Sequence, residues 1–319
     1  MTCAELPSYL ELYGSGELEQ RAAQAWQSLS HCELCPHRCG ADRLAGERGR
    51  CRSLAMPVVA SANLHAWEEP PLSGTRGSGT IFFGGCTGRC RFCQNYPISQ
   101  LGIGREVSLE RLAGMMVKLQ ERGAHNINFV TPTHYAAAIL AVLPMAVEQG
   151  LCIPLLYNSS GFERVSTLRQ MESVIDIWLP DAKYASDEVA LSLSGFPDYT
   201  AHNRSALREM YRQVGDRVET DGEGIAWRGL IIRHMVLPNR LAGTRQVLRW
   251  IAENLSPQVH VSLMAQYFPA YECVDDSMLG RKITAEEYEE AVAVLDEVGL
   301  EDGWVQEHKE GEDDVDTLR

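Results

Sequence analysis

The sequence predicts an α/β fold, in which a partial six-stranded (β/α)6 barrel follows a small Cys-rich metal-binding segment. Short apolar runs alternate with amphipathic stretches from residue 80 onward, as βα units of a parallel sheet do. There are six such units, too few to close an eight-stranded barrel. A doubly wound open sheet is the alternative that periodicity leaves open. The segment is predicted from four closely spaced cysteines that lie among few large apolar residues.

The chain divides into five stretches. Residues 1–30 carry apolar side chains at helical spacing and predict a helical lead-in. Residues 31–56 form the Cys-rich metal-binding segment, whose small core must be completed by a metal or a neighbouring domain. Residues 57–79 are a connector rich in Gly, Pro and Ser, too turn-laden for a helix. Residues 80–270 hold the barrel, and residues 271–319 a C-terminal helix and an acidic tail whose composition predicts disorder.

The barrel's elements follow from its apolar runs. The expected strands are residues 80–85, 126–132, 153–160, 174–183, 230–238 and 259–269. The expected helices are residues 108–123, 134–150, 162–171, 203–215 and 244–255. In parallel α/β folds the chemistry lies at the carboxyl ends of the strands. Polar residues gather at these ends or within the fifth strand: Cys86, Thr131, Thr133, Asn158, Ser159, Asp181, Lys183 and Arg233.

Composition narrows the class of protein. The 319 residues are 45% apolar and 23% charged, as in ordinary globular proteins. Neither an apolar run of about 18 residues nor a basic and then apolar N-terminus is present, so we expect a cytoplasmic chain without a membrane contact. A net charge of −14 argues against nucleic acid as a partner. Ten cysteines in such a chain indicate metal binding or catalysis more than disulfides.

Three cysteines, Cys86, Cys90 and Cys93, follow the first expected strand in one short loop. A closed structural metal site is four-coordinate, so three thiolates leave a position open. In a 4Fe-4S cluster that position is on one of the irons. A zinc site completed by a distant fourth ligand is the alternative.

The cysteine spacing in "GGCTGRCRFCQN" (84–95) resembles the signature of the radical S-adenosylmethionine enzymes, the radical SAM enzymes. The resemblance implies that S-adenosylmethionine binds the open iron of a 4Fe-4S cluster through its amino and carboxylate groups. It implies reductive cleavage to methionine and a 5′-deoxyadenosyl radical, which abstracts a substrate hydrogen. It also implies an electron donor such as flavodoxin or ferredoxin.

Further motifs resemble the glycyl-radical-enzyme activating enzymes, and homologues of pyruvate formate-lyase activating enzyme above all. These are the Gly- and Ser-rich lead at 73–79, "LPDAK" at 179–183 and "IIRHMVLPN" at 231–239. The resemblance implies an oxidoreductase that activates a glycyl radical protein. Two alternatives stay open: radical modification of a small molecule or a peptide, and a non-catalytic iron–sulfur or zinc protein.

The resemblance also implies roles for barrel residues. Lys183 and Arg233 would meet the methionyl carboxylate, and Asp181 with Asn158 and Ser159 would match a monovalent-cation site. Asn158 stands where the family has a carboxylate. An ordinary salt bridge is the alternative for Asp181 and Lys183, and pairing with a barrel carboxylate is the alternative for Arg233.

The second expected strand departs from the family pattern. The family's Gly-Gly-Glu, which receives the methionyl amino group, is replaced here by "TPTHY" (131–135). Thr131 and Thr133 would therefore bind that group through a hydroxyl or a backbone carbonyl.

The second cysteine set consists of Cys32, Cys35, Cys39 and Cys51, separated by two, three and eleven residues. Four thiolates suit tetrahedral zinc or an auxiliary iron–sulfur cluster, and we favour the cluster because the neighbouring chemistry needs iron and sulfide. His31 and His37 are alternative ligands. Ahead of the first strand, His65, Glu68 and Glu69 are expected either to contact the substrate or to lie in a solvated loop.

Overall fold

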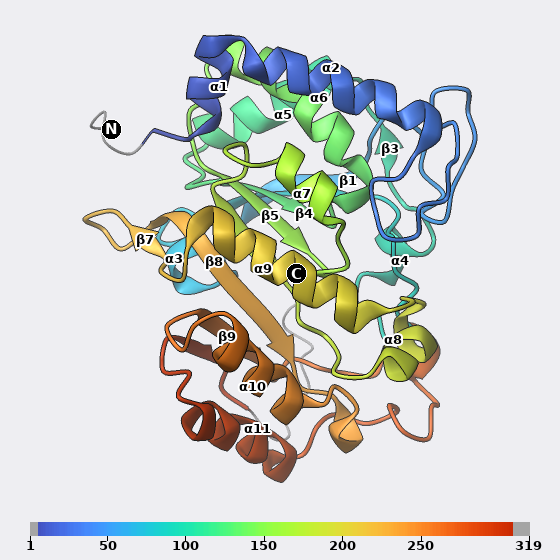
Figure 1. Cartoon of the computed structure of the whole chain (residues 1–319), viewed down its shortest axis with the longest axis vertical. Helices are drawn as coiled ribbons and strands as arrows, with labels where there is room; N and C mark the ends of the chain where they lie inside the picture. Colours follow the sequence, from blue (N-terminus) through green and yellow to red (C-terminus); the bar gives the residue numbers. More distant parts are fainter. Residues whose placement is uncertain (1–5, 309–319) are drawn as a thin grey trace.

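A computed structural model describes residues 6–308 as a mixed α/β fold around one large sheet (Figure 1). The described strands run in the order β10-β9-β8-β6-β5-β4-β2-β1-β3, and β7 pairs with β8. Their bounds are β1 Val58–His65, β2 Ser78–Phe83, β3 Arg105–Glu106, β4 Ile127–Val130, β5 Leu155–Ser159, β6 Ile177–Pro180, β7 Glu219–Thr220, β8 Ala226–Met235, β9 His260–Met264 and β10 Gly303–Val305.

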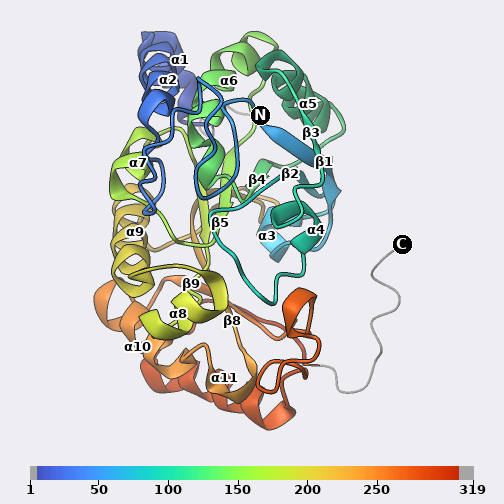
Figure 2. The same cartoon turned by 90° about the vertical axis from the view of Figure 1, so that its right-hand side faces the viewer.

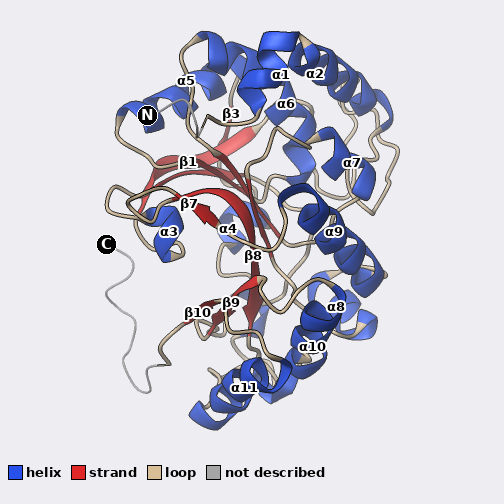
Figure 3. Cartoon of the chain, turned by 60° about the vertical axis from the view of Figure 1, so that its left-hand side comes forward, coloured by secondary structure: helices blue, strands red, loops and turns tan. Residues whose placement is uncertain are grey.

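The longer helices form an arc around the outside of the curved sheet (Figure 3). The α-helices are α1 Tyr9–Ser15, α2 Glu17–Gln27, α3 Pro70–Ser73, α4 Tyr96–Ser99, α5 Leu109–Glu121, α6 Ala136–Glu148, α7 Val165–Gln170, α8 Asp187–Ser194, α9 Tyr199–Val214, α10 Thr244–Asn254 and α11 Ala285–Val298. A doubly wound fold places helices on both faces of its sheet. The one-sided arc is therefore the arrangement of a barrel.

The six strands expected from the sequence are β2, β4, β5, β6, β8 and β9, and each runs parallel to the next in that order. The sheet is nevertheless larger than predicted. The expected connector at 57–79 contains β1, which pairs antiparallel with β2, and the short helix α3. The sequence did not predict β1, because half-exposed small and polar side chains follow its two valines and give no alternating apolar pattern. Backbone pairing holds the strand in place.

The expected barrel helices form where their apolar faces meet the sheet. In α5, Leu112, Met116 and Leu119 recur at helical spacing and are buried, and the Ser108 side chain caps the helix by accepting a hydrogen bond from the Arg111 amide. Helix α6 is apolar on nearly all sides because it lies between α2 and α5. Figure 2 shows α1 and α2 at the opposite end of the molecule from α10 and α11.

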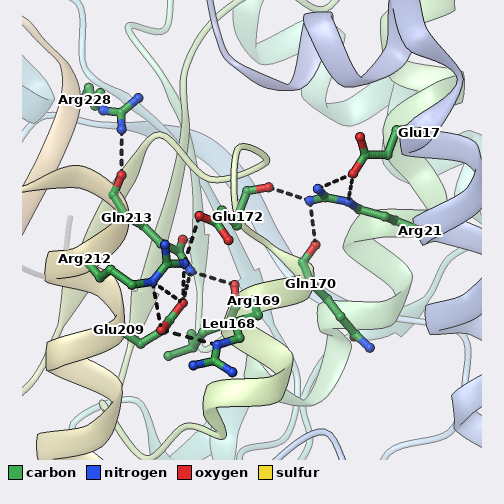
Figure 4. Close-up of polar contacts among 10 residues, drawn as sticks. All are labelled: Glu17, Arg21, Leu168, Arg169, Gln170, Glu172, Glu209, Arg212, Gln213 and Arg228. Carbon is green, nitrogen blue, oxygen red and sulfur yellow. Dashed lines mark hydrogen bonds and ion pairs between the residues drawn. The ribbon is translucent and has the colours of Figure 1, made fainter.

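Ion pairs connect the outer helices α7 and α9 (Figure 4). Glu209 of α9 has a side chain only 4% exposed and accepts hydrogen bonds from Arg212, while Arg169 of α7 lies 3.5 Å from its other oxygen. Burial alone would raise the pKa of Glu209, but the hydrogen bonds from Arg212 and Gln213 lower it. Arg21 of α2 donates to the Glu172 carbonyl, which ties the lead-in to the same layer.

The lead-in helices α1 and α2 lie in the stretch predicted to be helical. Asp176, at the start of β6, accepts hydrogen bonds from the amides of Ser8 (3.1 Å) and Leu155 (3.0 Å) and so joins this stretch to the sheet. The predicted disordered tail lies largely at 309–319, outside the described residues. Within residues 6–308, no helix has the length and apolar character needed to cross a bilayer. The boundaries of the five stretches remain a prediction.

Candidate functional site

One cavity of about 540 Å³ lies inside the barrel and reaches the carboxyl ends of its parallel strands. Most of the barrel residues singled out in the sequence line it. They are Cys86, Cys90, Cys93, Thr131, Asn158, Ser159, Asp181, Lys183 and Arg233. The fold thus brings together residues that lie up to 147 positions apart in the chain (Cys86 to Arg233).

The three barrel cysteines share a loop after β2, and each sulfur has a polar partner. The Gly88 amide donates to Cys86 Sγ (3.3 Å), and the Ser194 hydroxyl donates to Cys90 Sγ (3.0 Å). Cys93 Sγ lies 3.1 Å from the Ser99 hydroxyl oxygen. Hydrogen bonds to cluster sulfurs stabilise thiolates and tune the potential of iron–sulfur clusters.

Burial controls the ionisation of Cys86 and Cys90. Burial raises the pKa of Cys86 to about 12 and that of Cys90 to about 11, and repulsion between neighbouring thiolates adds to both shifts. Free thiols here stay protonated at neutral pH, whereas coordination to a metal deprotonates a thiol outright. The three thiols therefore fit a metal cluster that supplies positive charge. Ser194 and Ser99 were not anticipated, since nothing in the sequence ties either serine to the cysteine motif.

Asp181 and Lys183 follow β6 and form an ion pair on the cavity wall, with 2.5 Å between Asp181 Oδ2 and Lys183 Nζ. Burial alone would lower the pKa of Lys183, but the charges of Asp181 and Cys90 raise it above its ordinary value. The salt bridge considered for these residues is thus present. The ammonium also lies within electrostatic reach of Cys90.

Arg233 lies on β8 and is held by two glutamates from the segment between β1 and β2. Its Nε and Nη2 donate to the two carboxylate oxygens of Glu69 at 2.8 and 2.7 Å, and Nη2 also donates to Glu68. Burial alone would lower the pKa of Arg233, but the two carboxylates raise it. The alternative for Arg233 was pairing with a barrel carboxylate; the structure instead pairs it with two carboxylates of the expected connector. Glu68 and Glu69 line the cavity and do not form a solvated loop.

The two threonines of "TPTHY" have different positions. Thr131 lines the cavity with a left-handed φ of 58°, and its amide donates to the Asn158 carbonyl at 2.9 Å. Such a φ is strained for a β-branched residue and is typical of functional sites. Thr133 is buried elsewhere and its hydroxyl donates to Glu163 Oε1 at 2.6 Å, so the fold does not bring it to the cavity.

Glu163 was not anticipated. It is 1% exposed, and the hydroxyls of Thr133 and Tyr157 donate to its carboxylate. Burial raises the pKa of Glu163 to about 7, and the surrounding hydroxyl hydrogen bonds limit the shift. It lies in the loop after β5, where sequence alone does not separate a buried carboxylate from an exposed one.

The four N-terminal cysteines lie in the segment that packs against the loop of Cys86. Cys32 and Cys51 are buried, Cys35 is half-buried and Cys39 is exposed. Burial, with smaller contributions from Cys51 and Cys32, raises the pKa of Cys35. Among residues 6–308 no three Cys, His, Asp or Glu side chains are grouped around a single ion position. Thiolates of a 4Fe-4S cluster each bind a different iron, so they need no common ion position.

The two cysteine sets are neighbours in space. A ring nitrogen of His37 lies 2.9 Å from the Thr87 carbonyl oxygen, so this histidine contacts the barrel loop. Arg89 Nη2 donates to the Arg50 carbonyl at 2.6 Å, one residue before Cys51. The N-terminal segment thus packs directly on the loop that carries Cys86.

No family model matches the chain. It is 29% identical over 301 residues to the uncharacterized protein MJ0674 of Methanocaldococcus jannaschii, covering 92% of this chain and 82% of that protein. The maturase HydG of the FeFe-hydrogenase from Carboxydothermus hydrogenoformans superimposes with a TM-score of 0.51 and 12% identity, covering 95% of this chain and 70% of HydG. The chain shares the fold of this maturase.

A second HydG crystal structure gives the same TM-score of 0.51 and identity of 12%, over 75% of this chain and 54% of HydG. The chain thus spans about half the length of that maturase. The mixed α/β fold predicted from the sequence is confirmed by these likenesses, which concern the fold.

Proposed function

We propose that this chain is a radical SAM enzyme. Cys86, Cys90 and Cys93 would hold a 4Fe-4S cluster, at which S-adenosylmethionine is reductively cleaved so that a hydrogen can be abstracted from the substrate. One observation carries the proposal: three thiols on one loop, each with a polar partner at its sulfur, line the same cavity as the strand-end polar residues. The shared fold with HydG supports it.

When bound, the cluster supplies one electron and S-adenosylmethionine supplies the hydrogen-abstracting group. The chain's own residues would bind and orient S-adenosylmethionine. Lys183 offers an ammonium to the methionyl carboxylate beside the cysteines, and Arg233, fixed by its two glutamates, is a further proposed contact. The Thr131 oxygens are the proposed acceptors for the methionyl amino group, because the Thr133 hydroxyl is hydrogen-bonded to Glu163.

The N-terminal set would form a second metal site. We propose an auxiliary iron–sulfur cluster rather than zinc on Cys32, Cys35, Cys39 and Cys51, because four thiolates suit such a cluster and the neighbouring chemistry already needs iron and sulfide. Its contact with the barrel loop would let it pass electrons from a donor such as flavodoxin or ferredoxin. A monovalent cation at Asp181, Asn158 and Ser159 would compete with Lys183 for the Asp181 carboxylate.

More specifically, we propose that the substrate is a glycyl radical protein, which this chain activates. The motifs at 73–95, 179–183 and 231–239 support this substrate. Radical modification of a small molecule or a peptide uses the same cavity. A non-catalytic iron–sulfur or zinc protein would not need polar groups from four strand ends around an enclosed space.

The test is anaerobic reconstitution with iron and sulfide, followed by dithionite and S-adenosylmethionine. We expect the wild type to form 5′-deoxyadenosine and methionine, and Cys90→Ala to form neither. Cys152→Ala, which removes a thiol outside both sets, is the matched control and should behave as wild type. Iron-replete wild-type protein that leaves S-adenosylmethionine intact would refute the proposed function.

A further inference from the structure

The cavity has a second end, away from the cysteines. His65 at the end of β1 pairs with Ser78 at the start of β2, so the residues after β1 lie at the amino end of the parallel strands. Cys86 follows the carboxyl end of β2, and six residues of strand span about 20 Å. Trp67 and the backbone of Glu68 therefore lie at the end of the cavity opposite to the cluster cysteines. The Glu68 carboxylate reaches inward from there to Arg233.

This far end carries more negative than positive charge. The side chains of Glu68 and Glu69 are only 7% and 5% exposed, and both pair with the single guanidinium of Arg233. Glu69 forms the bidentate pair and Glu68 shares Nη2. Asp181, which is bridged to Arg233 in the sheet, is balanced by Lys183. Two buried like charges that share one cation are costly unless a second cation is bound.

An unpaired acceptor lies beside Glu68. Asn128 is fully buried on β4, and its Nδ2 donates to Glu68 Oε1 at 3.0 Å, which fixes the orientation of the amide. Within residues 6–308 its Oδ1 has no hydrogen-bond partner. Side chains alternate along a strand, so Asn128 is on the same face as Val130, which lines the cavity. An acceptor and an excess carboxylate together call for a ligand that has several N–H donors and a positive charge.

Two tryptophans line the same cavity. Trp67 lines the cavity although it is 88% exposed, and Trp304 of β10 lines it from the other edge of the sheet. The His260 ring, 5.5 Å away centroid to centroid, packs against Trp304. Figure 3 shows α3, which follows the Trp67 loop, and β10 on the inner side of the curve. Indole faces attract ammonium and guanidinium groups, which an exposed tryptophan beside a carboxylate is suited to hold.

We propose that the far end of the cavity binds a positively charged nitrogen of the substrate, an alkylammonium or a guanidinium group, between Glu68 and the two tryptophans. The inference rests on the proposed function and names the substrate class of the same site. A cation anchored there places the rest of the substrate between the far end and the cysteines. The cation can belong to a free amine or to a lysine or arginine side chain of a peptide, because both present the same chemistry.

The test is calorimetric binding to the anaerobically reconstituted protein with S-adenosylmethionine present. The cationic probes are hexylamine and N-acetyl-glycyl-lysyl-glycinamide, and the neutral matches are 1-hexanol and the norleucine peptide. At least one cationic probe should bind about tenfold or more tightly than its match. Tighter binding of hexylamine indicates a free amine as the substrate, and tighter binding of the lysine peptide indicates a peptide.

Glu68→Gln should weaken the preferred probe about tenfold or more, and Trp67→Ala about two- to fivefold. Glu290→Gln, at an exposed ion pair with Arg240, is the control and should change nothing. The affinity for S-adenosylmethionine, measured on the same samples, should change far less than the affinity for the probe. Circular dichroism would show that each variant is folded.

Equal binding of cationic and neutral probes would overturn the inference. So would an equal loss of S-adenosylmethionine and probe affinity in Glu68→Gln, because the carboxylate would then serve the cofactor. Wild-type protein that takes up iron but does not bind S-adenosylmethionine would instead refute the proposed function, so the two failures are distinguishable.

Discussion

The two cysteine sets differ in the elements that hold them and in their exposure to solvent. Cys86, Cys90 and Cys93 follow a central strand, each sulfur has a polar partner, and all three line a cavity. The N-terminal set is built on loops: Cys39 is exposed, and the Cys39 sulfur touches the Cys32 carbonyl only at 3.9 Å. The barrel set opens onto the cavity, whereas the N-terminal set lies in a segment that packs on the barrel loop.

The difference follows from where each loop is anchored. The barrel loop starts at β2 and is held by Ser194 of α8 and Ser99 of α4, elements that the barrel core fixes. The N-terminal segment has few large apolar residues and is held by contacts such as that of His37 with Thr87. We therefore expect the barrel site to carry the chemistry and the N-terminal site to support it.

The largest expected effect separates the two sets directly. Cys90→Ala removes one of only three thiolates at the barrel site, so the cluster is lost and 5′-deoxyadenosine formation should fall at least about a hundredfold. Cys35→Ala should keep slow 5′-deoxyadenosine formation, because the barrel site is intact, while modification of the substrate falls. Anaerobic assays under dithionite, with iron counted in each variant, measure both.

A folded Cys35→Ala protein that keeps the barrel cluster but forms no 5′-deoxyadenosine would contradict this division. The N-terminal site would then belong to the cleavage machinery. Cys152→Ala serves again as the control, since its thiol belongs to neither set.

The metal content sharpens the comparison further. If both sets hold 4Fe-4S clusters, the reconstituted wild type should contain about eight iron and eight sulfide per chain. Elemental analysis and sulfide determination measure this. About four iron with one zinc would show that the N-terminal set is a zinc site and would leave the barrel proposal intact.

A smaller effect is expected at the cavity wall. Lys183→Ala should weaken S-adenosylmethionine binding by about 10- to 100-fold without emptying the cluster, since a charge-assisted hydrogen bond contributes roughly 1.5–3 kcal/mol. Equilibrium dialysis with iron-replete protein measures the affinity. Lys118→Ala, on the exposed face of α5, is the control. Unchanged affinity of the variant for S-adenosylmethionine would show that Lys183 forms only a structural salt bridge with Asp181.

The smallest effect concerns the junction between the lead-in and the barrel. Burial raises the pKa of Asp176 to about 6, although the amides of Leu155 and Ser8 oppose the shift. A carboxyl whose folded pKa is raised stabilises the fold below its unfolded pKa, near 4, and this stability is lost as the pH rises through about 6. The contribution of Asp176 to the free energy of unfolding should therefore fall by roughly 1–2 kcal/mol from pH 5 to pH 8.

Asp176→Asn should remove the part of the pH dependence that Asp176 contributes, because the amide does not ionise. Glu163, whose pKa burial raises to about 7, still titrates in both proteins. Urea unfolding of wild type and variant at several pH values under anaerobic conditions checks it. Equal slopes with pH in the two proteins would show that Asp176 does not titrate in this range.

The sequence predicted the six parallel strands and the residues at their ends, because apolar periodicity and the position of polar residues after a strand are local signals. It missed β1, whose half-exposed pattern carries no period, and it assigned Thr133 to the site. The backbone turn after Thr131 determines whether the Thr133 side chain faces the cavity or Glu163. Tertiary packing fixes that turn.

The partners of the site residues were not predictable either. Ser194 lies 104 positions from Cys90, and Glu69 lies 164 positions from Arg233. Such pairs are set by how strands and loops close around the cavity, which no local pattern encodes. The role of Lys183 stays a prediction until ligand binding is measured.

The most direct test of the central claim is electron paramagnetic resonance of the reduced protein with and without S-adenosylmethionine. Cys35→Ala isolates the barrel cluster, and Cys90→Ala isolates the N-terminal cluster. The account predicts that S-adenosylmethionine changes the spectrum of Cys35→Ala and leaves that of Cys90→Ala unchanged, because only three thiolates leave an iron open. A spectral change in Cys90→Ala, or none in iron-replete Cys35→Ala, would contradict it.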